Sequence, residues 1–178
     1  EVSSNQSLTV LETPTTDQVN AEITATALDQ PIKSIPRGSS GVLVGRFELK
    51  GAGQLQHITI QREGVGNNSD FAQLYAFWVD PGQPARRISS NQSLRVDQQA
   101  FFTVDVPLKT SAILEIRGDI SATAGALSQH AFRLISVKTS QKLFSFSSAS
   151  AQYVGTTIEL SPVLIGSVVV RNNGALND

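Results

Sequence analysis

Residues 101–108 read Phe-Phe-Thr-Val-Asp-Val-Pro-Leu, and from Phe102 onward every second side chain is apolar. The side chains between them belong to Thr103, Asp105 and Pro107. Successive side chains of an extended chain point to opposite faces, so a period of two predicts a strand with one buried and one exposed face. This stretch therefore favours an all-β protein.

Other parts of the chain repeat this period of two. Ala and Ile alternate with Glu and Thr along residues 20–28. A second alternation covers residues 43–49, where Gly45 predicts a bulge or a close backbone approach. Residues 74–79 are apolar on both faces, as is typical of a central strand, and Trp78 is the expected aromatic centre of the core.

Further strands are expected at 7–11, 57–62, 111–116, 130–137, 142–146, 153–160 and 167–171. Gly, Pro, Asn and Asp gather in the intervals, above all at 64–70, 80–82, 117–119 and 172–174, and they predict turns there. Residues 121–127 are the best candidate for a helix, although Gly125 is equally compatible with a turn. Roughly ten short strands at this spacing predict an antiparallel β-sandwich of the Ig-like or jelly-roll type.

The first 36 residues differ in composition from the rest. They are rich in Thr, Ser, Gln and Asn, contain three spaced prolines and hold few large apolar side chains, so they cannot form a core alone. We therefore expect an extended N-terminal arm over residues 1–36 and a sandwich domain over residues 37–178. The arm either returns onto its own sandwich as edge strands or docks on a neighbouring subunit. In the second case it is a candidate donor strand, and its expected contacts are Leu8, Val10, Ile23 and Leu28.

The composition excludes several classes of function. The 178 residues include no Cys and no Met, and their net charge is -1. The chain therefore has no disulfide framework and no thiolate site, and without a basic excess a nucleic-acid partner is not expected. No stretch approaches the ~20 apolar residues of a membrane span. The absence of Met leads us to expect a processed, extracellular chain whose signal peptide has been removed.

Catalytic chemistry finds little support in these residues. Only His57 and His130 can supply an imidazole, and each is expected to be a surface or partly buried residue of a strand. No nucleophile elbow accompanies them, and no carboxylate pair of the kind that glycosidases use stands out. Residues 51–53 (Gly-Ala-Gly) lack the lysine and the helix of a phosphate loop. We expect a protein that is not an enzyme and needs no cofactor.

Three short motifs mark weaker candidate sites. Asn67 and Asp70 are the best calcium candidates, although turn chemistry explains them without a metal. The glycosylation pattern Asn-x-Ser occurs at Asn5, Asn67 and Asn91, and Asn5 and Asn91 lie in two copies of Ser-Ser-Asn-Gln-Ser-Leu, a repeat better explained by chance than by duplication. An integrin-type Arg-Gly-Asp at 117–119 is interpreted as a turn that ends a strand, and no adhesion is expected through it.

Two segments carry a family resemblance. The first is residues 35–49, which read Ile-Pro-Arg-Gly-Ser-Ser-Gly-Val-Leu-Val-Gly-Arg-Phe-Glu-Leu. The second lies within residues 106–120 and contains Val-Pro-Leu-Lys-Thr-Ser followed by Leu-Glu-Ile-Arg-Gly-Asp-Ile. Both resemble Ig-like β-sandwich modules of large secreted and cell-surface bacterial proteins, including those of candidate-phylum bacteria. The resemblance covers about residues 32–137, and Lys109 departs from the glycine usual there. It implies a fold and an extracellular location rather than an activity.

These observations lead to two functional hypotheses. The first is a structural subunit of an extracellular assembly, a pilus-like filament or a surface layer, in which residues within 1–30 add as a strand to the next subunit and build a homopolymer. The alternative is an adhesion module, excised from a larger surface protein, that binds glycans or proteins. Such a module is expected to be monomeric and to expose an aromatic side chain on a loop or a sheet face.

Overall fold

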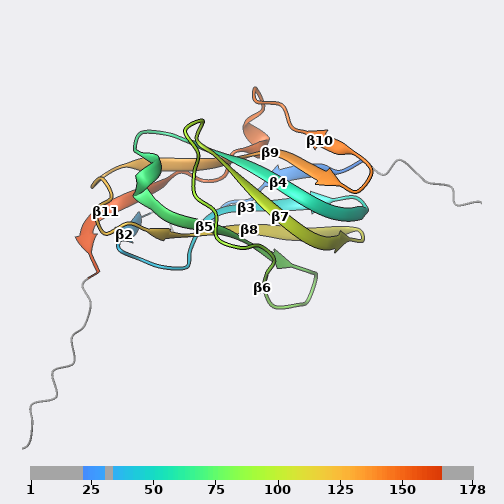
Figure 1. Cartoon of the computed structure of the whole chain (residues 1–178), viewed down its shortest axis with the longest axis horizontal. Helices are drawn as coiled ribbons and strands as arrows, with labels where there is room; N and C mark the ends of the chain where they lie inside the picture. The colour runs from blue at the N-terminus through green and yellow to red at the C-terminus, as the bar shows by residue number, and fades with distance from the viewer. Residues whose placement is uncertain (1–21, 31–33, 166–178) are drawn as a thin grey trace, which may run out of the picture.

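The computed structural model describes residues 22–30 and 34–165 and forms β-strands and 3₁₀ turns in that part of the chain, with no α-helix (Figure 1). The strands are β1 (Thr24–Ala27), β2 (Ser34–Arg37), β3 (Val42–Lys50), β4 (Gly53–Glu63), β5 (Phe71–Val79), β6 (Arg86–Arg87), β7 (Gln99–Leu108), β8 (Ser111–Ile120), β9 (Gln129–Thr139), β10 (Leu143–Ser145) and β11 (Ile158–Leu164). The 3₁₀ turns are η1 (Asn68–Asp70) and η2 (Ala151–Tyr153).

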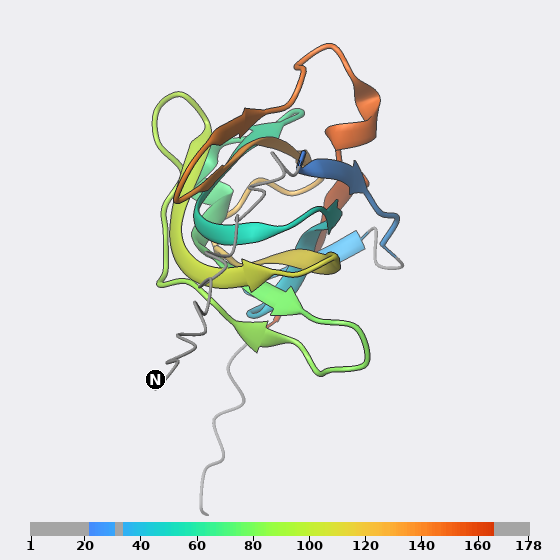
Figure 2. The same cartoon turned by 90° about the vertical axis from the view of Figure 1, so that its right-hand side faces the viewer.

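Two sheets face each other and curl around a common interior (Figure 2). The first sheet has the strand order β1-β3-β8-β5-β6 and the second has the order β2-β11-β9-β4-β7, with β10 paired to β9 beside that path. Every pairing is antiparallel except that of β2 with β11, which is parallel. The all-β sandwich expected from the sequence is confirmed, with one parallel pair added.

The core lies between the sheets and is built by the predicted alternation. Along β7 every second residue from Ala100 to Leu108 is buried and every residue between them is exposed. Trp78 is fully buried, as are Phe47, Phe102 and Phe132. Burial of such side chains stabilises the fold by about 1.5–3 kcal/mol each relative to an exposed position.

The bulge predicted at Gly45 is present. Leu43 pairs with Arg117 and Gly45 pairs with Ile116, so Val44 is an extra residue on β3. A side chain at Gly45 would bring its Cβ within 3.2 Å of the Phe47 ring. Glycine therefore allows β3 to bend here while Val44 and Phe47 both stay buried.

The described part of the predicted arm returns onto its own sandwich. β1 belongs to the first sheet and β2 to the second, so the sandwich already includes residues that were assigned to the arm. Ile23, Ala25 and Ile35 are buried in the core. The strands expected at 7–11 and 167–171 lie outside the described residues, and the candidate helix at 121–127 is a pair of turns.

Candidate functional site

The edges of the sheets differ in how they are protected against pairing with another chain. Pro36 lies in β2 and Pro107 in β7, and a proline removes one backbone donor from an edge. β6 has only two residues, both of them arginine. Short, charged or proline-containing edges resist the addition of a foreign strand. β1, with four residues, and β10, with three, hold neither a proline nor a charged residue, and we call them the unguarded edges of the described residues in that sense.

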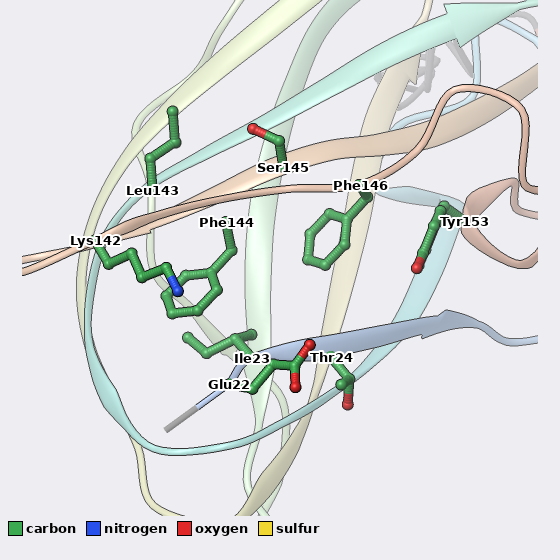
Figure 3. Close-up of a pocket in the computed structure, with 9 residues that line it drawn as sticks. All are labelled: Glu22, Ile23, Thr24, Lys142, Leu143, Phe144, Ser145, Phe146 and Tyr153. Carbon is green, nitrogen blue, oxygen red and sulfur yellow. The ribbon is translucent and has the colours of Figure 1, made fainter. Parts of the chain in front are cut away.

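These two unguarded edges border the same groove (Figure 3). Its volume is about 420 Å³. The residues that line it are Glu22, Ile23, Thr24, Lys142, Leu143, Phe144, Ser145, Phe146 and Tyr153. β1 lies along one side and β10 along the other, and the rings of Phe144 and Phe146 project from the β10 side toward β1. We call this site the β1/β10 groove.

The backbone of β10 has hydrogen-bonding groups free to face the groove. Phe146 donates its N–H to the carbonyl oxygen of Ile135 in β9 at 2.9 Å. Because bonding direction alternates along an antiparallel strand, the N–H and C=O groups of Leu143 and Ser145 are directed away from β9. No strand of the described chain pairs with that edge.

The same alternation applies to β1. Leu28 donates its N–H to the carbonyl oxygen of Arg46 at 2.8 Å. The backbone groups of Ala25 and Ala27 are therefore directed away from β3, toward the open side of the strand. Neither alanine is among the residues that line the groove, so an extended peptide in the groove would meet free backbone donors and acceptors on the β10 side.

The side chains of the groove combine aromatic rings with one charge of each sign. The rings of Phe146 and Tyr153 lie 5.0 Å apart between their centroids, and Lys142 places its Nζ 5.1 Å from the centroid of Phe144. Glu22 is exposed on the opposite wall. The site can thus pack β-branched side chains against aromatic rings and bind peptide backbone at the edge of β10.

The contact residues predicted from the sequence are only partly available to such a partner. Ile23 is 3% exposed in the core of its own sandwich, and Leu28 is half-buried with its N–H bonded to Arg46. Both residues already have partners in their own fold, and their contact with a neighbouring subunit stays a prediction. Leu8 and Val10 lie outside the described residues.

A second polar cluster is buried under the turn at 64–70. His130 is fully buried, its Nε2 lies 3.1 Å from Asp70 Oδ2, and its Nδ1 lies 3.2 Å from Arg62 Nη1. A guanidinium can only donate, so Nδ1 must accept and the imidazole proton sits on Nε2, facing Asp70. Arg62 also donates from Nε to Asn68 Oδ1 at 2.9 Å. His130 is therefore a core residue and not the surface or partly buried one that was expected.

Asp70, one of the two weak calcium candidates, is bonded within its own turn. Asp70 is 2% exposed, and it accepts the backbone N–H groups of Asn67 at 3.0 Å and Gly125 at 3.0 Å. Burial alone would raise the pKa of Asp70, but these donors and His130 hold it below its usual value. Among residues 22–30 and 34–165 no cluster of three or more acidic or imidazole side chains is arranged to hold a metal.

The pKa of His130 is lowered, first because burial disfavours the imidazolium and second because Arg62 faces it. The charge of Asp70 opposes this effect without cancelling it. The cluster therefore contains a neutral imidazole between a cation and an anion, and no nucleophile adjoins His130 in the contacts described. His57, by contrast, is exposed on β4 as expected.

The Arg-Gly-Asp sequence is not a turn. Residues 117–119 lie inside β8, where all three pair with β5 and the first two also pair with β3. The carboxylate of Asp119 accepts the N–H of Gly41 at 2.8 Å and the hydroxyl of Tyr75 at 2.9 Å, and Gln73 donates to its other oxygen. Pairing with the neighbouring strands thus outweighs the local preference of Gly and Asp for turns. The carboxylate of Asp119 already accepts hydrogen bonds from three groups of its own chain.

Outward-facing aromatic rings of the first sheet are covered by arginines. The guanidinium carbon of Arg87 lies 4.4 Å from the ring centroid of Tyr75, and that of Arg117 lies 4.2 Å from Phe77. On β7, Phe101 is 36% exposed and carries Arg95 at 4.2 Å. Sugar rings stack on bare aromatic faces, so these three positions give the glycan-binding alternative little support.

The glycosylation candidates have different surroundings. Asn67 and Asn91 are both exposed, whereas Asn5 lies outside the described residues. The side-chain amide of Asn91 accepts from Arg87 and donates to Gln73. Asn67 begins the η1 turn at the surface, so it is the more accessible of the two described asparagines.

Sequence reasoning missed the groove although it found β10. The alternation Phe144-Ser145-Phe146 predicted the strand. It did not predict that β1 lies opposite the two rings, because the sequence of a short strand does not indicate its spatial neighbours. The Arg62–His130–Asp70 cluster was missed for a similar reason, since the three residues come from β4, β9 and η1. The Gly-rich turn at 64–70 was its one local sign, because a Cβ at Gly66 would lie 2.4 Å from the His130 ring.

Comparisons with known proteins add little to this geometry. No family model and no curated protein matches the chain. One similar solved structure is AvmM, which catalyses macrocyclization in alchivemycin A biosynthesis, with 10% identity, a TM-score of 0.38, and coverage of 84% of this chain and 92% of that one. Another is a DUF4466 family protein from Parabacteroides merdae, with 18% identity, a TM-score of 0.39, and coverage of 76% of this chain and 44% of that one. Likeness at this level assigns no function.

Proposed function

We propose that this protein is a non-enzymatic structural subunit of an extracellular assembly, and that a strand from a second copy of the chain adds to the β1/β10 groove. The observation that carries the proposal is the position of the two unguarded strand edges, which border one groove while the other edges hold prolines or arginines. Strand addition uses backbone hydrogen bonds for affinity and side-chain pockets for specificity.

The composition supports self-association. With a net charge of -1 and only 16% charged residues, copies of the chain repel one another weakly. Residues 1–21 and 166–178 lie outside the described sandwich and provide chain that can reach a neighbour. A polar content dominated by Ser, Thr, Gln and Asn agrees with the proposed extracellular location.

The experiment compares the native chain with Ser145→Pro, and Ser145→Ala is the matched control. The N–H of Ser145 is directed away from β9, so proline removes a donor from the groove without breaking a bond inside the sheet. We expect the native chain and Ser145→Ala to form the same oligomers with rising concentration, whereas Ser145→Pro stays monomeric.

Light scattering after size exclusion and electron microscopy give the readout. The fluorescence of Trp78, the single tryptophan, confirms that each variant is folded. A native chain that stays monomeric at every concentration overturns the proposal and favours the adhesion module. Assembly of Ser145→Pro equal to that of the native chain also overturns it.

A further inference from the structure

The chain leaves the sandwich through a run of exposed apolar residues. Val163, Leu164 and Ile165, at the end of β11, are 60%, 50% and 53% exposed. Leu127 donates its N–H to the carbonyl oxygen of Leu160 at 2.8 Å and is itself 61% exposed. Its φ of 64° is in the left-handed region, which is unfavourable for leucine. Large side chains exposed together in this way are typical of an interaction surface.

The sequence beyond Ile165 continues in the same character. Residues 163–170 read Val-Leu-Ile-Gly-Ser-Val-Val-Val, with no proline and no charge. Five of the eight are β-branched residues, which favour strands: Val163, Ile165, Val168, Val169 and Val170. No other stretch outside the described sandwich combines this length with this apolar content. The candidate in the N-terminal arm, residues 7–11, is shorter and more polar.

The groove and this segment lie at opposite ends of the molecule. Both β11 and β10 pair with β9, the first at His130 and the second at Val137. These two positions are seven residues apart on β9, which is about 23 Å at 3.3 Å per residue. β11 runs antiparallel to β9 and continues past the N-terminal end of β9. The six residues from Glu159 to Ile165 therefore add about 20 Å in the direction away from β10. Figure 1 shows the end of β11 on one side of the sandwich and β10 on the other.

The segment therefore cannot fill the groove of its own copy. The five residues from 166 to 170 span at most about 18 Å when fully extended, against a distance of roughly 40 Å. Any insertion of this segment into a β1/β10 groove must join two copies. The N-terminal residues differ in this respect, because Glu22 itself lines the groove and a strand before it can fold back onto its own copy.

Leu164 and Ile165 stay beside β2, where Ile165 donates its N–H to Arg37, and we propose that residues 166–170 of one copy, which follow directly, form the strand that adds to the β1/β10 groove of the next copy. This inference rests on the proposed function and names its donor. The valine side chains pack against the rings of Phe144 and Phe146, and the strand backbone bonds to the free edge of β10. The contact joins different surfaces of the two copies, so it repeats head to tail and gives an open filament in place of a closed dimer.

The test uses full-length variants with charges on both faces of each candidate donor. Val168→Asp/Val169→Asp disrupts the C-terminal segment, and Val10→Asp/Leu11→Asp is its matched control in the N-terminal arm. We expect the first variant to be monomeric and the second to assemble like the native chain. All four positions lie outside the described sandwich, so the urea unfolding curve followed by Trp78 fluorescence should be unchanged for both.

Mixing gives a sharper result. Val168→Asp/Val169→Asp keeps an intact groove, and Ser145→Pro keeps an intact donor, so the two monomers together should form 1:1 complexes that grow no further. Assembly lost in Val10→Asp/Leu11→Asp but kept in Val168→Asp/Val169→Asp overturns this inference while the proposed function stands. Native-like assembly of both donor variants and of Ser145→Pro overturns the proposed function itself.

Discussion

The two histidines of this chain have opposite surroundings, and the fold lowers the pKa of His130. His130 is fully buried between Arg62 and Asp70, whereas His57 is exposed on β4. Burial and Arg62 lower the pKa of His130, so the folded state resists protonation at a pH where the unfolded chain, near its ordinary pKa of about 6.5, accepts a proton. The unfolded state then binds more protons, and stability falls as the pH falls.

The first prediction concerns this pH dependence. Between about pH 7 and pH 5, His130 should contribute a slope of up to about 1.4 kcal/mol per pH unit to the free energy of unfolding. Urea denaturation at several pH values should show this slope in the native chain and in His57→Gln, but not in His130→Gln. A slope that disappears with His57→Gln instead would contradict the assignment. Asp70, whose pKa is lowered, contributes a separate loss at more acidic pH, as the pH falls below its ordinary pKa of about 3.9.

Single residues were predictable where burial follows from local pattern. Trp78 and Phe102 were assigned to the core correctly because alternation along one strand decides which face is buried. His130 was not, because its environment depends on Arg62 and Asp70, which are distant in sequence. A histidine at the start of a strand carries no local sign that a guanidinium and a carboxylate will enclose it.

At the scale of elements, long alternating strands were found and short or interrupted ones were misjudged. β7, β8 and β9 follow apolar patterns that extend over many residues. The interval at 117–119 was read as a turn because Gly and Asp favour turns locally, but β8 continues through it between two partner strands. Pairing on both sides outweighs local preference in a central strand.

The second prediction concerns the guarded edge of β7. Pro107 lies in the edge strand β7, where its partner in the neighbouring strand β4 is Gln54. Because proline has no backbone N–H, β7 has one hydrogen-bond donor fewer. Pro107→Val should restore the donor and lengthen an edge open to pairing, while changing the free energy of unfolding by less than about 1 kcal/mol. In a Ser145→Pro background, which closes the β1/β10 groove, light scattering should therefore rise with concentration. Scattering no higher than that of Ser145→Pro alone would show that the proline is not what guards β7.

At the scale of the whole molecule, the sequence indicated a sandwich and left open whether the arm returns onto it as edge strands. β1 and β2 are four residues each and hold few large side chains, so their composition resembles that of a linker. What places them in the fold is their partners: β1 adds to β3, and β2 adds in parallel to β11, more than 120 residues later in the chain. No local pattern encodes a pairing at that separation.

The third prediction tests where the domain begins. A chain that starts at residue 22 keeps Ile23, Ala25 and Ile35, whereas one that starts at residue 37, the boundary expected from composition, loses all three from the core. Loss of a single large core side chain commonly costs about 2–5 kcal/mol, against a total stability of about 5–15 kcal/mol for a domain. We expect residues 22–178 to unfold cooperatively in urea, with Trp78 fluorescence like that of the full chain, and residues 37–178 to be unfolded or insoluble. A cooperative transition of similar midpoint in residues 37–178 would mean that β1 and β2 cover the sandwich without stabilising it, and the groove would then lose one of its fixed walls.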